Sequence, residues 1–165
     1  MIIVTGASDG LGYEIAKLLQ ANGKRVVNIS RRSSDVSTEN ILVDLSTEDG
    51  VKSAAAGIIG YKEPIEAIIH NAGVLTLQSL GDISYAEIER TFRINTYAPL
   101  FLTSLLAERI KQDSTDIVFI DSTAGLYPYV GQSVYDASKR AVHGFIEDLR
   151  EEYKDLSSRI IGIYP

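Results

Sequence analysis

The sequence predicts an α/β fold, a doubly wound parallel sheet of six strands with helices on both faces. Short runs that are apolar at consecutive positions alternate along the chain with segments of helical periodicity. Glycines or polar residues follow five of these runs, at the sheet edge where ligands bind in such folds. We expect residues 1–165 to form a single domain.

Four apolar runs predict strands in the first half of the chain, at residues 2–4, 25–30, 40–43 and 65–69. Apolar residues recur at helical spacing over residues 11–21, and Asn22-Gly23 ends this helix. Ser46 is expected to cap the next helix, because an acidic residue follows three positions later.

The second half continues the alternation of strands and helices. Ser84 caps a predicted helix that ends near Arg93, and a longer apolar helix follows over residues 97–111. Pro99 is tolerated there because it falls in the first turn. Strands at 117–120 and 159–164 flank a long helix at 134–153.

Composition excludes several classes of site. Apolar residues make up 45% of the chain, and the net charge of −6 argues against a nucleic-acid surface. The chain has no cysteine, which excludes disulfides and thiolate chemistry, and we expect no metal site. No apolar run reaches membrane-spanning length and nothing resembles a signal peptide, so a cytoplasmic protein is expected.

Tyr135 and Lys139 are four residues apart, on one face of the predicted helix. A free Tyr titrates near pKa ~10, too high for efficient acid–base work near neutrality, and a nearby ammonium favours the phenolate. The pattern alone also occurs by chance in many helices. Ser122 after the fifth strand and the glycine-rich turn favour an activated proton donor.

The segment Thr5-Gly6-Ala7-Ser8-Asp9-Gly10-Leu11-Gly12 joins the first strand to the first helix. Its glycines could serve only a tight turn. Backbone N–H groups at a helix N-terminus also receive a pyrophosphate, and we predict this use in a Rossmann-type fold. The spacing Gly-x-x-x-Gly-x-Gly differs from the commoner Gly-x-Gly-x-x-Gly.

Five motifs in this order resemble the short-chain dehydrogenases/reductases, in their compact single-domain subtype. They are the glycine-rich turn, Asn71-Ala72-Gly73, Asn95, Ser122-Thr123-Ala124-Gly125 and Tyr135-x-x-x-Lys139. The resemblance implies hydride transfer between NADP(H) or NAD(H) and a small carbonyl or alcohol substrate.

The resemblance also implies a role for each catalytic residue. Tyr135 is the general acid/base, Lys139 lowers its pKa and binds the nicotinamide ribose, and Ser122 holds the substrate oxygen. Asn95 connects Lys139 to solvent through water. The implied cofactor-binding residues are Gly6, Ser8, Asp9, Gly10, Leu11, Gly12, Ser30, Arg31, Arg32, Asp44, Leu45, Asn71, Ala72, Gly73, Tyr135, Lys139 and Pro165.

The residues after the second strand favour NADP(H) over NAD(H). Ser30-Arg31-Arg32 offers arginines where a reader of NAD usually has an acid, and guanidinium suits a 2′-phosphate. The alternative is a solvated pair of loop arginines. Asp9 opposes the NADP(H) assignment, because many NADP users in the family have a basic residue in the glycine turn.

The end of the sequence departs from the family pattern, in which a substrate-covering region follows the sixth strand. This region is absent from the sequence, which ends at Pro165. We expect the sequence to be part of a longer chain that carries the region, and the alternative is a naturally short protein. An active NADP(H)-dependent oxidoreductase is favoured, because all four catalytic residues are present. The alternative is a nucleotide-binding or interaction protein that kept the fold but lacks turnover without its substrate lid.

The resemblance further implies a homodimer or homotetramer. Family members commonly pair through the helices predicted here at 97–111 and 134–153. Phe145 and Leu149 lie on the apolar stripe of the second helix. They either cover the sheet or face the partner subunit.

Overall fold

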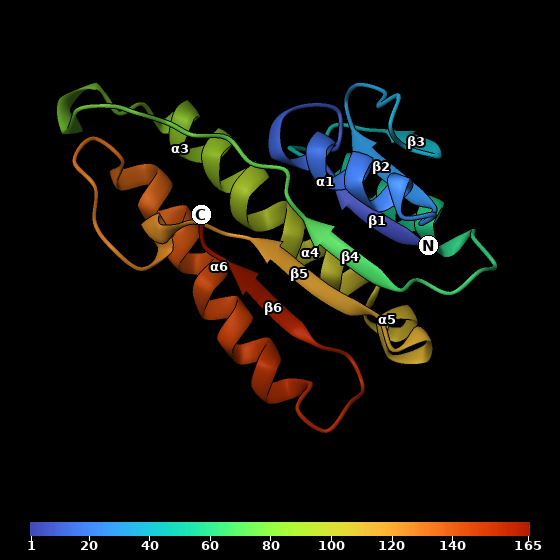
Figure 1. Ribbon diagram of the computed structural model, residues 1–165. Coiled ribbons are helices and arrows are strands. Elements are labelled where there is room, and N and C mark those ends of the chain that lie inside the picture. The colour runs from blue at the N-terminus through green and yellow to red at the C-terminus, as the bar shows by residue number, and fades with distance from the viewer.

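The computed structural model describes residues 1–165 and contains one sheet of six parallel strands in the order β3-β2-β1-β4-β5-β6 (Figure 1). The strands are β1 (Ile2–Thr5), β2 (Val26–Ser30), β3 (Glu39–Leu42), β4 (Ala67–His70), β5 (Asp116–Ile120) and β6 (Ile160–Ile163). The predicted doubly wound sheet is confirmed. The strand order reverses between β1 and β4, which creates the crevice where such folds bind ligands.

Six α-helices connect the strands: α1 (Gly10–Ala21), α2 (Glu48–Ile59), α3 (Tyr85–Phe92), α4 (Ala98–Leu105), α5 (Ala107–Asp113) and α6 (Ser133–Glu152). A π-helical turn (Arg93–Tyr97) joins α3 to α4, and short 3₁₀ turns lie at Leu80–Asp82 and Thr123–Gly125. None of these helices combines the length and the apolar composition that a membrane span requires.

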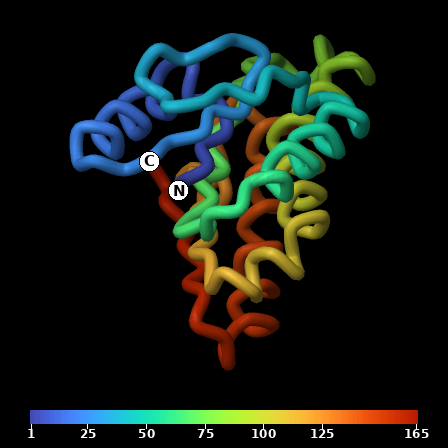
Figure 2. Tube along the Cα trace, turned by 90° about the vertical axis from the view of Figure 1, so that its right-hand side faces the viewer, coloured from blue at the N-terminus to red at the C-terminus, as the bar shows by residue number.

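The two faces of the sheet are covered unequally. In Figure 2, α1 lies on one side of the strands, while α2, α4 and α5 lie on the other. Right-handed crossovers produce this division, because the chain moves one way from β1 to β2 and the other way from β4 to β6. The main core therefore lies under α2, α4, α5 and α6.

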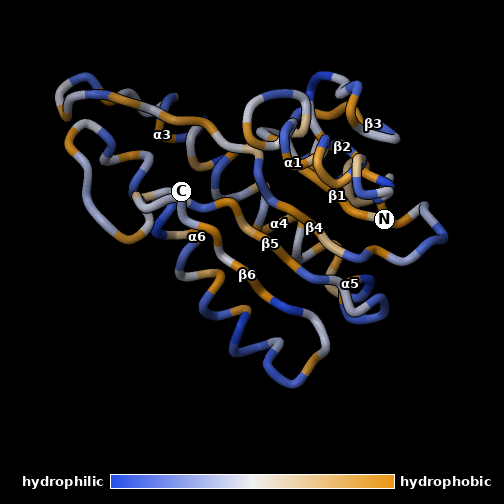
Figure 3. Tube along the Cα trace, in the orientation of Figure 1, coloured by the Kyte–Doolittle hydropathy of each residue, from blue (hydrophilic) through white to orange (hydrophobic).

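Alternate strand residues supply this core. Ile3, Ile29, Ile68 and Phe119 point toward α2, α4 and α6 and are almost fully buried. Each such side chain contributes ~1.5–3 kcal/mol relative to an exposed one. The neighbouring residues Ile2, Val4 and Val26 form a smaller cluster under α1. Figure 3 shows the apolar colour concentrated along the strands.

Two expectations about the helices were wrong. The helix predicted over residues 97–111 is divided at Leu106 into α4 and α5. The chain also stays helical from α3 through Asn95, with no break before Tyr97. The first of these differences has no signal in the sequence, because neither Gly nor Pro stands near Leu106.

The N-cap of α2 also differs from the prediction. Thr47, not Ser46, caps the helix, and its hydroxyl accepts a hydrogen bond from the Gly50 N–H at 3.0 Å. The Ser46 hydroxyl instead donates to Asp44 Oδ1 at 2.8 Å. The strand-end aspartate therefore decides which of two good capping residues is used.

Leu149 and Phe145 cover the sheet. Leu149 is 5% exposed within the main core, and Phe145 is half-buried, packing edge-on against Phe119 with ring centroids 5.9 Å apart. The suggestion that Leu149 faces a partner subunit is therefore wrong.

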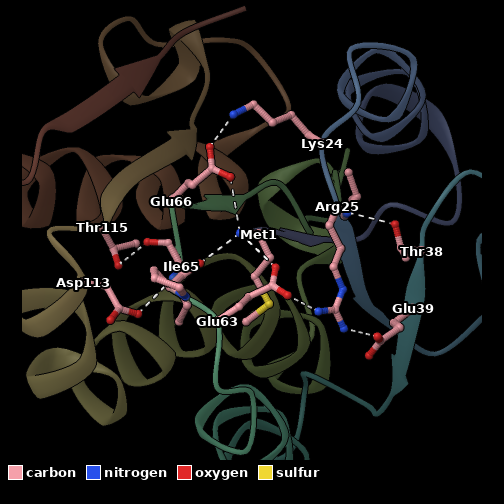
Figure 4. Close-up of polar contacts among 12 residues, drawn as sticks. Met1, Lys24, Arg25, Thr38, Glu39, Glu63, Ile65, Glu66, Asp113 and Thr115 are labelled. Carbon is pink, nitrogen blue, oxygen red and sulfur yellow. Dashed lines mark hydrogen bonds and ion pairs between the residues drawn. The ribbon is translucent and has the colours of Figure 1, made fainter.

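A polar cluster fixes the opposite end of the sheet, around the start of β1 (Figure 4). The Met1 ammonium donates to the Pro64 carbonyl at 2.9 Å and pairs with Glu63 at 3.3 Å. Arg25 binds both Glu63 and Glu39, which links the start of β2 to the start of β3 and to the segment before β4. These charges lie at the amino ends of the strands, away from the edge where the glycine-rich turn stands.

Candidate active site

The carboxyl ends of the strands enclose a cleft of about 440 Å³. Most of the predicted cofactor residues line it together: Gly6, Ser8, Asp9, Gly10, Leu11, Ser30, Arg31, Arg32, Asp44, Leu45, Asn71, Ala72 and Gly73. Gly12, Tyr135, Lys139 and Pro165 are not among the lining residues. The cleft therefore joins residues from four strand ends that are far apart in the sequence.

The glycine-rich turn has the geometry of a phosphate cradle. Gly6 and Gly10 have φ of +73° and +56°, in the left-handed region that favours glycine. Gly12 must lack a side chain, because a Cβ there would lie 2.3 Å from Asn71 Nδ2 and 2.4 Å from the Gly6 carbonyl oxygen. These glycines bring the backbone of β1, β4 and α1 unusually close together.

Helix α1 presents unpaired donors to this cleft. Asp9 caps the helix by accepting from the Gly10 N–H at 2.8 Å. The N–H groups of Leu11 and Gly12 find no acceptor within the chain. Such free donors at the positive end of a helix fit a pyrophosphate. The residues present therefore fit a dinucleotide.

Thr5 and Asn71 join the two strands at the point where the strand order reverses. Thr5 Oγ1 accepts hydrogen bonds from the N–H groups of Asn71 and Ala72, both at 3.0 Å. The Asn71 side-chain amide donates back to the Thr5 carbonyl at 3.0 Å. This reciprocal contact fixes the floor of the cleft. Thr5 was absent from the residues selected from the sequence.

Asn28, a buried residue that the sequence analysis missed, connects the glycine turn to the arginine loop. Its Oδ1 accepts from the Ala7 N–H at 3.0 Å. Its Nδ2 donates to Ser30 Oγ, the Arg32 carbonyl and Asn40 Oδ1 at 3.1, 3.0 and 2.8 Å. A polar residue in the apolar strand β2 was the available signal, because a fully buried amide needs partners.

The two arginines after β2 are in different electrostatic environments. Arg32 makes an ion pair with Asp9 at 3.0 Å, and both side chains are largely exposed. The hydrogen bond from Arg32 lowers the pKa of Asp9. Arg31 is exposed and makes no ion pair within the chain. The pKa of Asp44 is lowered chiefly by hydrogen bonds from the backbone N–H and the hydroxyl of Ser46. The charge of Arg31 makes a smaller contribution in the same direction.

The side chains of Ser122 and Tyr135 interact beyond the end of β5, with Ser122 immediately after Asp121 and Tyr135 in the first turn of α6. Ser122 Oγ accepts from the Ala124 N–H at 3.1 Å, which leaves its hydroxyl proton to be donated elsewhere. Burial raises the pKa of Tyr135, and interaction with the Ser122 side chain opposes this rise.

Lys139 lies one helical turn beyond Tyr135 and is 6% exposed. Its ammonium donates to the Ile120 carbonyl at 3.0 Å and lies 5.8 Å from the centre of the Tyr135 ring. Burial lowers the pKa of Lys139, and the charge of Asp121 opposes this effect. The pKa of Tyr135 is raised by its burial, so the lowering by Lys139 that the resemblance implies stays a prediction.

Asn95 lies in the π-helical turn, a feature often found at functional sites. Its side chain accepts from the Val74 N–H at 2.8 Å and donates to the Val74 carbonyl at 2.9 Å. It also donates to Ser138 Oγ at 3.1 Å, which ties the segment after β4 to α6. Asn95 makes no direct hydrogen bond to Lys139.

Pro165 lies beside the Ser122 turn. Its carbonyl accepts from the N–H and the hydroxyl of Thr123 at 3.1 and 3.2 Å. The Thr123 hydroxyl also accepts from the hydroxyl of Tyr129. This predicted cofactor residue therefore stands on the side of the site that carries Ser122.

The fold and the site define a dinucleotide-binding α/β domain with a Tyr–Lys pair beside a strand-end serine. The family model described as short chain dehydrogenase matches residues 1–165, and the chain belongs to this family. The recognition made from the five motifs is thus confirmed.

Known relatives agree with this placement. The L-xylo-3-hexulose reductase of Hypocrea jecorina is 35% identical over 86% of this chain and 58% of that protein. The L-xylulose reductase of Caenorhabditis elegans is 30% identical over 99% of this chain and 70% of that protein. A crystal structure of a metagenomic short-chain oxidoreductase in complex with NADP has a TM-score of 0.92 and 27% identity, covering 100% of this chain and 81% of that one. The chain spans 58% and 70% of the length of the two curated relatives.

Proposed function

We propose that this protein is an NADP(H)-dependent oxidoreductase that transfers a hydride between the nicotinamide and a small carbonyl or alcohol substrate. The observation that carries the proposal is the meeting of Ser122 and Tyr135 beyond the end of β5. Lys139 stands one turn further along α6, and the glycine-lined cleft opens at the same edge of the sheet. A protein that only binds a nucleotide has no need of this combination.

Ser122 and Tyr135 divide the work on the substrate oxygen. The bound nicotinamide supplies or accepts the hydride. The free hydroxyl proton of Ser122 orients the carbonyl oxygen, where negative charge develops during reduction. Tyr135 donates its phenolic proton to that oxygen, and in alcohol oxidation the phenolate takes it back.

Lys139 and Asn95 support this proton transfer. The Lys139 ammonium stabilises the phenolate by its positive charge once Tyr135 has lost its proton. It also reaches the nicotinamide ribose in this proposal. Asn95 holds the Val74 backbone against α6, and the proposed water path from Lys139 to solvent runs along this segment.

The preference for NADP(H) rests on charge at the adenosine end of the cleft. Arg31 is exposed and unpaired, so its guanidinium is free to bind a 2′-phosphate. Arg32 lies beside it, and Ser30, the last residue of β2, donates its hydroxyl to the Arg32 carbonyl. The NADP-bound structural relative supports this assignment.

Ketoses are the first substrates to test, because the names of the two curated relatives specify reductases of a hexulose and of xylulose. We propose a homo-oligomer as well. Tyr85 and Tyr97 are 75% and 60% exposed beside an apolar groove between α2, α3 and α4, and such a surface suits a second copy. Light scattering at micromolar concentration tests this proposal, and a monomeric mass throughout would contradict it.

The decisive experiment measures NADPH oxidation at 340 nm against a panel of ketoses and other carbonyl compounds. Tyr135→Phe should lower kcat by about two orders of magnitude or more, because the proton donor is lost. Tyr153→Phe is the matched control, since it removes the hydroxyl of a buried tyrosine at the far end of α6. Tight NADPH binding without turnover of any carbonyl would favour the nucleotide-binding alternative.

A further inference from the structure

Asp121 is a buried carboxylate that the proposed reaction does not use. It follows the last residue of β5 and directly precedes Ser122. Its residue exposure is 4%, and neither carboxyl oxygen has a hydrogen-bond partner. Buried carboxylates are costly unless another charge or a donor compensates them, so a compensating partner is expected nearby.

Lys139 is that partner. Its Nζ lies 3.9 Å from Asp121 Oδ1, and the lysine and aspartate side chains are 8% and 0% exposed. The ammonium donates a hydrogen bond to the carbonyl of Ile120, the residue before Asp121. Gly125 leaves room for the Asp121 carboxylate, because a Cβ on Gly125 would lie 3.0 Å from Asp121 Oδ2.

The other titratable groups around Asp121 come from α6 and from the residue after β6. His143 lies one turn beyond Lys139, and its Nδ1 is 2.7 Å from the Tyr164 hydroxyl. Tyr135 lies on the substrate side, where the charge of Asp121 contributes to raising its pKa. The 3₁₀ turn after Ser122 contributes no charged side chain. Lys139 and His143 are thus the cationic or protonatable partners of this carboxylate.

We propose that Asp121 is a positioning residue whose carboxylate keeps the Lys139 side chain protonated and anchored at the end of β5. This inference rests on the proposed function, in which Lys139 acts on Tyr135 and the nicotinamide ribose. Asp121 touches neither substrate nor cofactor and acts only through the lysine.

The charges around the pair give the anchor a pH dependence. Burial raises the pKa of Asp121 to about 6, while the charges of Lys139 and His143 oppose this rise. Asp121 is the only group whose charge opposes the effect of burial on the pKa of Lys139. Above about pH 6 the pair is therefore ionised, and below it Lys139 loses its counter-charge.

The test follows the lysine directly by NMR of protein labelled with ¹³C at lysine Cε. In Asp121→Asn the titration midpoint of Lys139 should fall by about one pH unit or more, because a unit charge at this distance is removed. Asp116→Asn is the matched control, since Asp116 lies at the opposite end of β5 and pairs with Arg159. An unchanged Lys139 midpoint in Asp121→Asn would overturn the proposal.

A measurement on the unsubstituted protein covers the case in which Asp121→Asn fails to fold. The Asp121 carboxyl carbon should titrate near pH 6, and Lys139 Cε should show an inflection at the same pH. A carboxyl that titrates near pH 4 without an effect on Lys139 would refute the pairing. Neither NMR readout requires turnover, so both can be interpreted even if no carbonyl substrate is found.

The activity readout separates a positioning role from a merely structural one. In Asp121→Asn the alkaline limb of the pH profile for NADPH-dependent reduction should move to lower pH, by the same interval as the Lys139 midpoint. Asp116→Asn should keep the original profile. A displaced lysine midpoint with an unchanged profile would overturn the positioning role, whereas coupled NMR titrations without any reductase activity would count against the proposed function alone.

Discussion

Replacing Arg31 by alanine tests the proposed preference for NADP(H). Arg31 has no ion-pair partner, whereas Arg32 is held by Asp9 at 3.0 Å. An incoming 2′-phosphate can therefore bind Arg31 without breaking an existing contact. A charge-assisted hydrogen bond of this kind contributes about 1.5–3 kcal/mol. NADPH affinity should fall about tenfold to a hundredfold in Arg31→Ala, while NADH affinity should stay nearly unchanged.

The ion pair between Asp9 and Arg32 predicts a graded series. Before Arg32 binds a phosphate it must leave Asp9, and an exposed pair of this kind is worth about 0.2–1 kcal/mol. Arg32→Ala should therefore weaken NADPH less than Arg31→Ala does. Asp9→Asn should tighten NADPH binding by up to about fivefold, because it releases the guanidinium and removes a carboxylate. The double arginine variant should show the largest loss.

Fluorescence titration of NADPH and NADH against each variant measures these differences. Arg90→Ala is the matched control, since it removes an exposed arginine of α3 that does not line the cleft. Raised salt should narrow the NADPH preference, because exposed charge pairs are screened. Equal losses for both cofactors in Arg31→Ala would place this arginine in fold support or adenine contact, and the NADP(H) assignment would then be dropped.

Further predictions concern Gly12 with Gly10 as its comparison, Asn28 and His70. Gly12→Ala should abolish dinucleotide binding and lower stability by roughly 1–3 kcal/mol in urea unfolding, since its Cβ meets backbone and amide atoms. Gly10→Ala, with open space around its Cβ, should cost only about 1 kcal/mol. Asn28→Ala should lower the free energy of unfolding by roughly 1–3 kcal/mol, because the Ala7 N–H loses its buried acceptor. It should also weaken NADPH binding, although Asn28 itself is not expected to contact the cofactor. Burial lowers the pKa of His70 to about 3, below its unfolded value of 6.5, so stability should fall by about 1.4 kcal/mol per pH unit as pH drops from 6.5 toward 3. His70→Gln should flatten this dependence, and parallel curves for the two proteins would contradict it.

The fold and the motif residues could be predicted because their signals are local. A short apolar run, a glycine turn and a helical stripe each occupy neighbouring positions, and parallel strands bring their ends to one edge of the sheet. This is why Gly6, Asn71 and Arg31 were selected together and line one cleft. The boundaries of α2 and α4 were predicted less accurately than the strands and the motif residues. Thr47 caps α2 because the hydroxyl of Ser46 donates its hydrogen bond to Asp44 instead. The capping residue therefore depends on a side-chain contact that the sequence pattern does not show.

Asn28 and Asp121 were not selected as site residues from the sequence, and the reason is the same for both. Each is a polar residue within or just after an apolar strand, and neither belongs to a spaced motif. Their partners come from other elements: Asn28 bonds the glycine turn and the arginine loop, and Asp121 faces Lys139 on α6. Only the folded chain shows these contacts, although a polar residue in a buried strand already predicts that some partner must exist.

The two ends of the site control charge in opposite ways, and this difference has consequences for pH and salt. At the adenosine end, Asp9 and Arg32 are exposed, so their pairing is weak, screened by salt and easily exchanged for a phosphate. At the end that carries Ser122 and Tyr135, Asp121 and Lys139 are buried, so their pairing is little screened by salt and depends on pH. Raised salt should therefore change cofactor preference but leave the pH profile in place. Asp121→Asn should do the reverse. A variant or condition that moved both properties together would show that the two ends are coupled through the sheet, which the separate contacts described above do not predict.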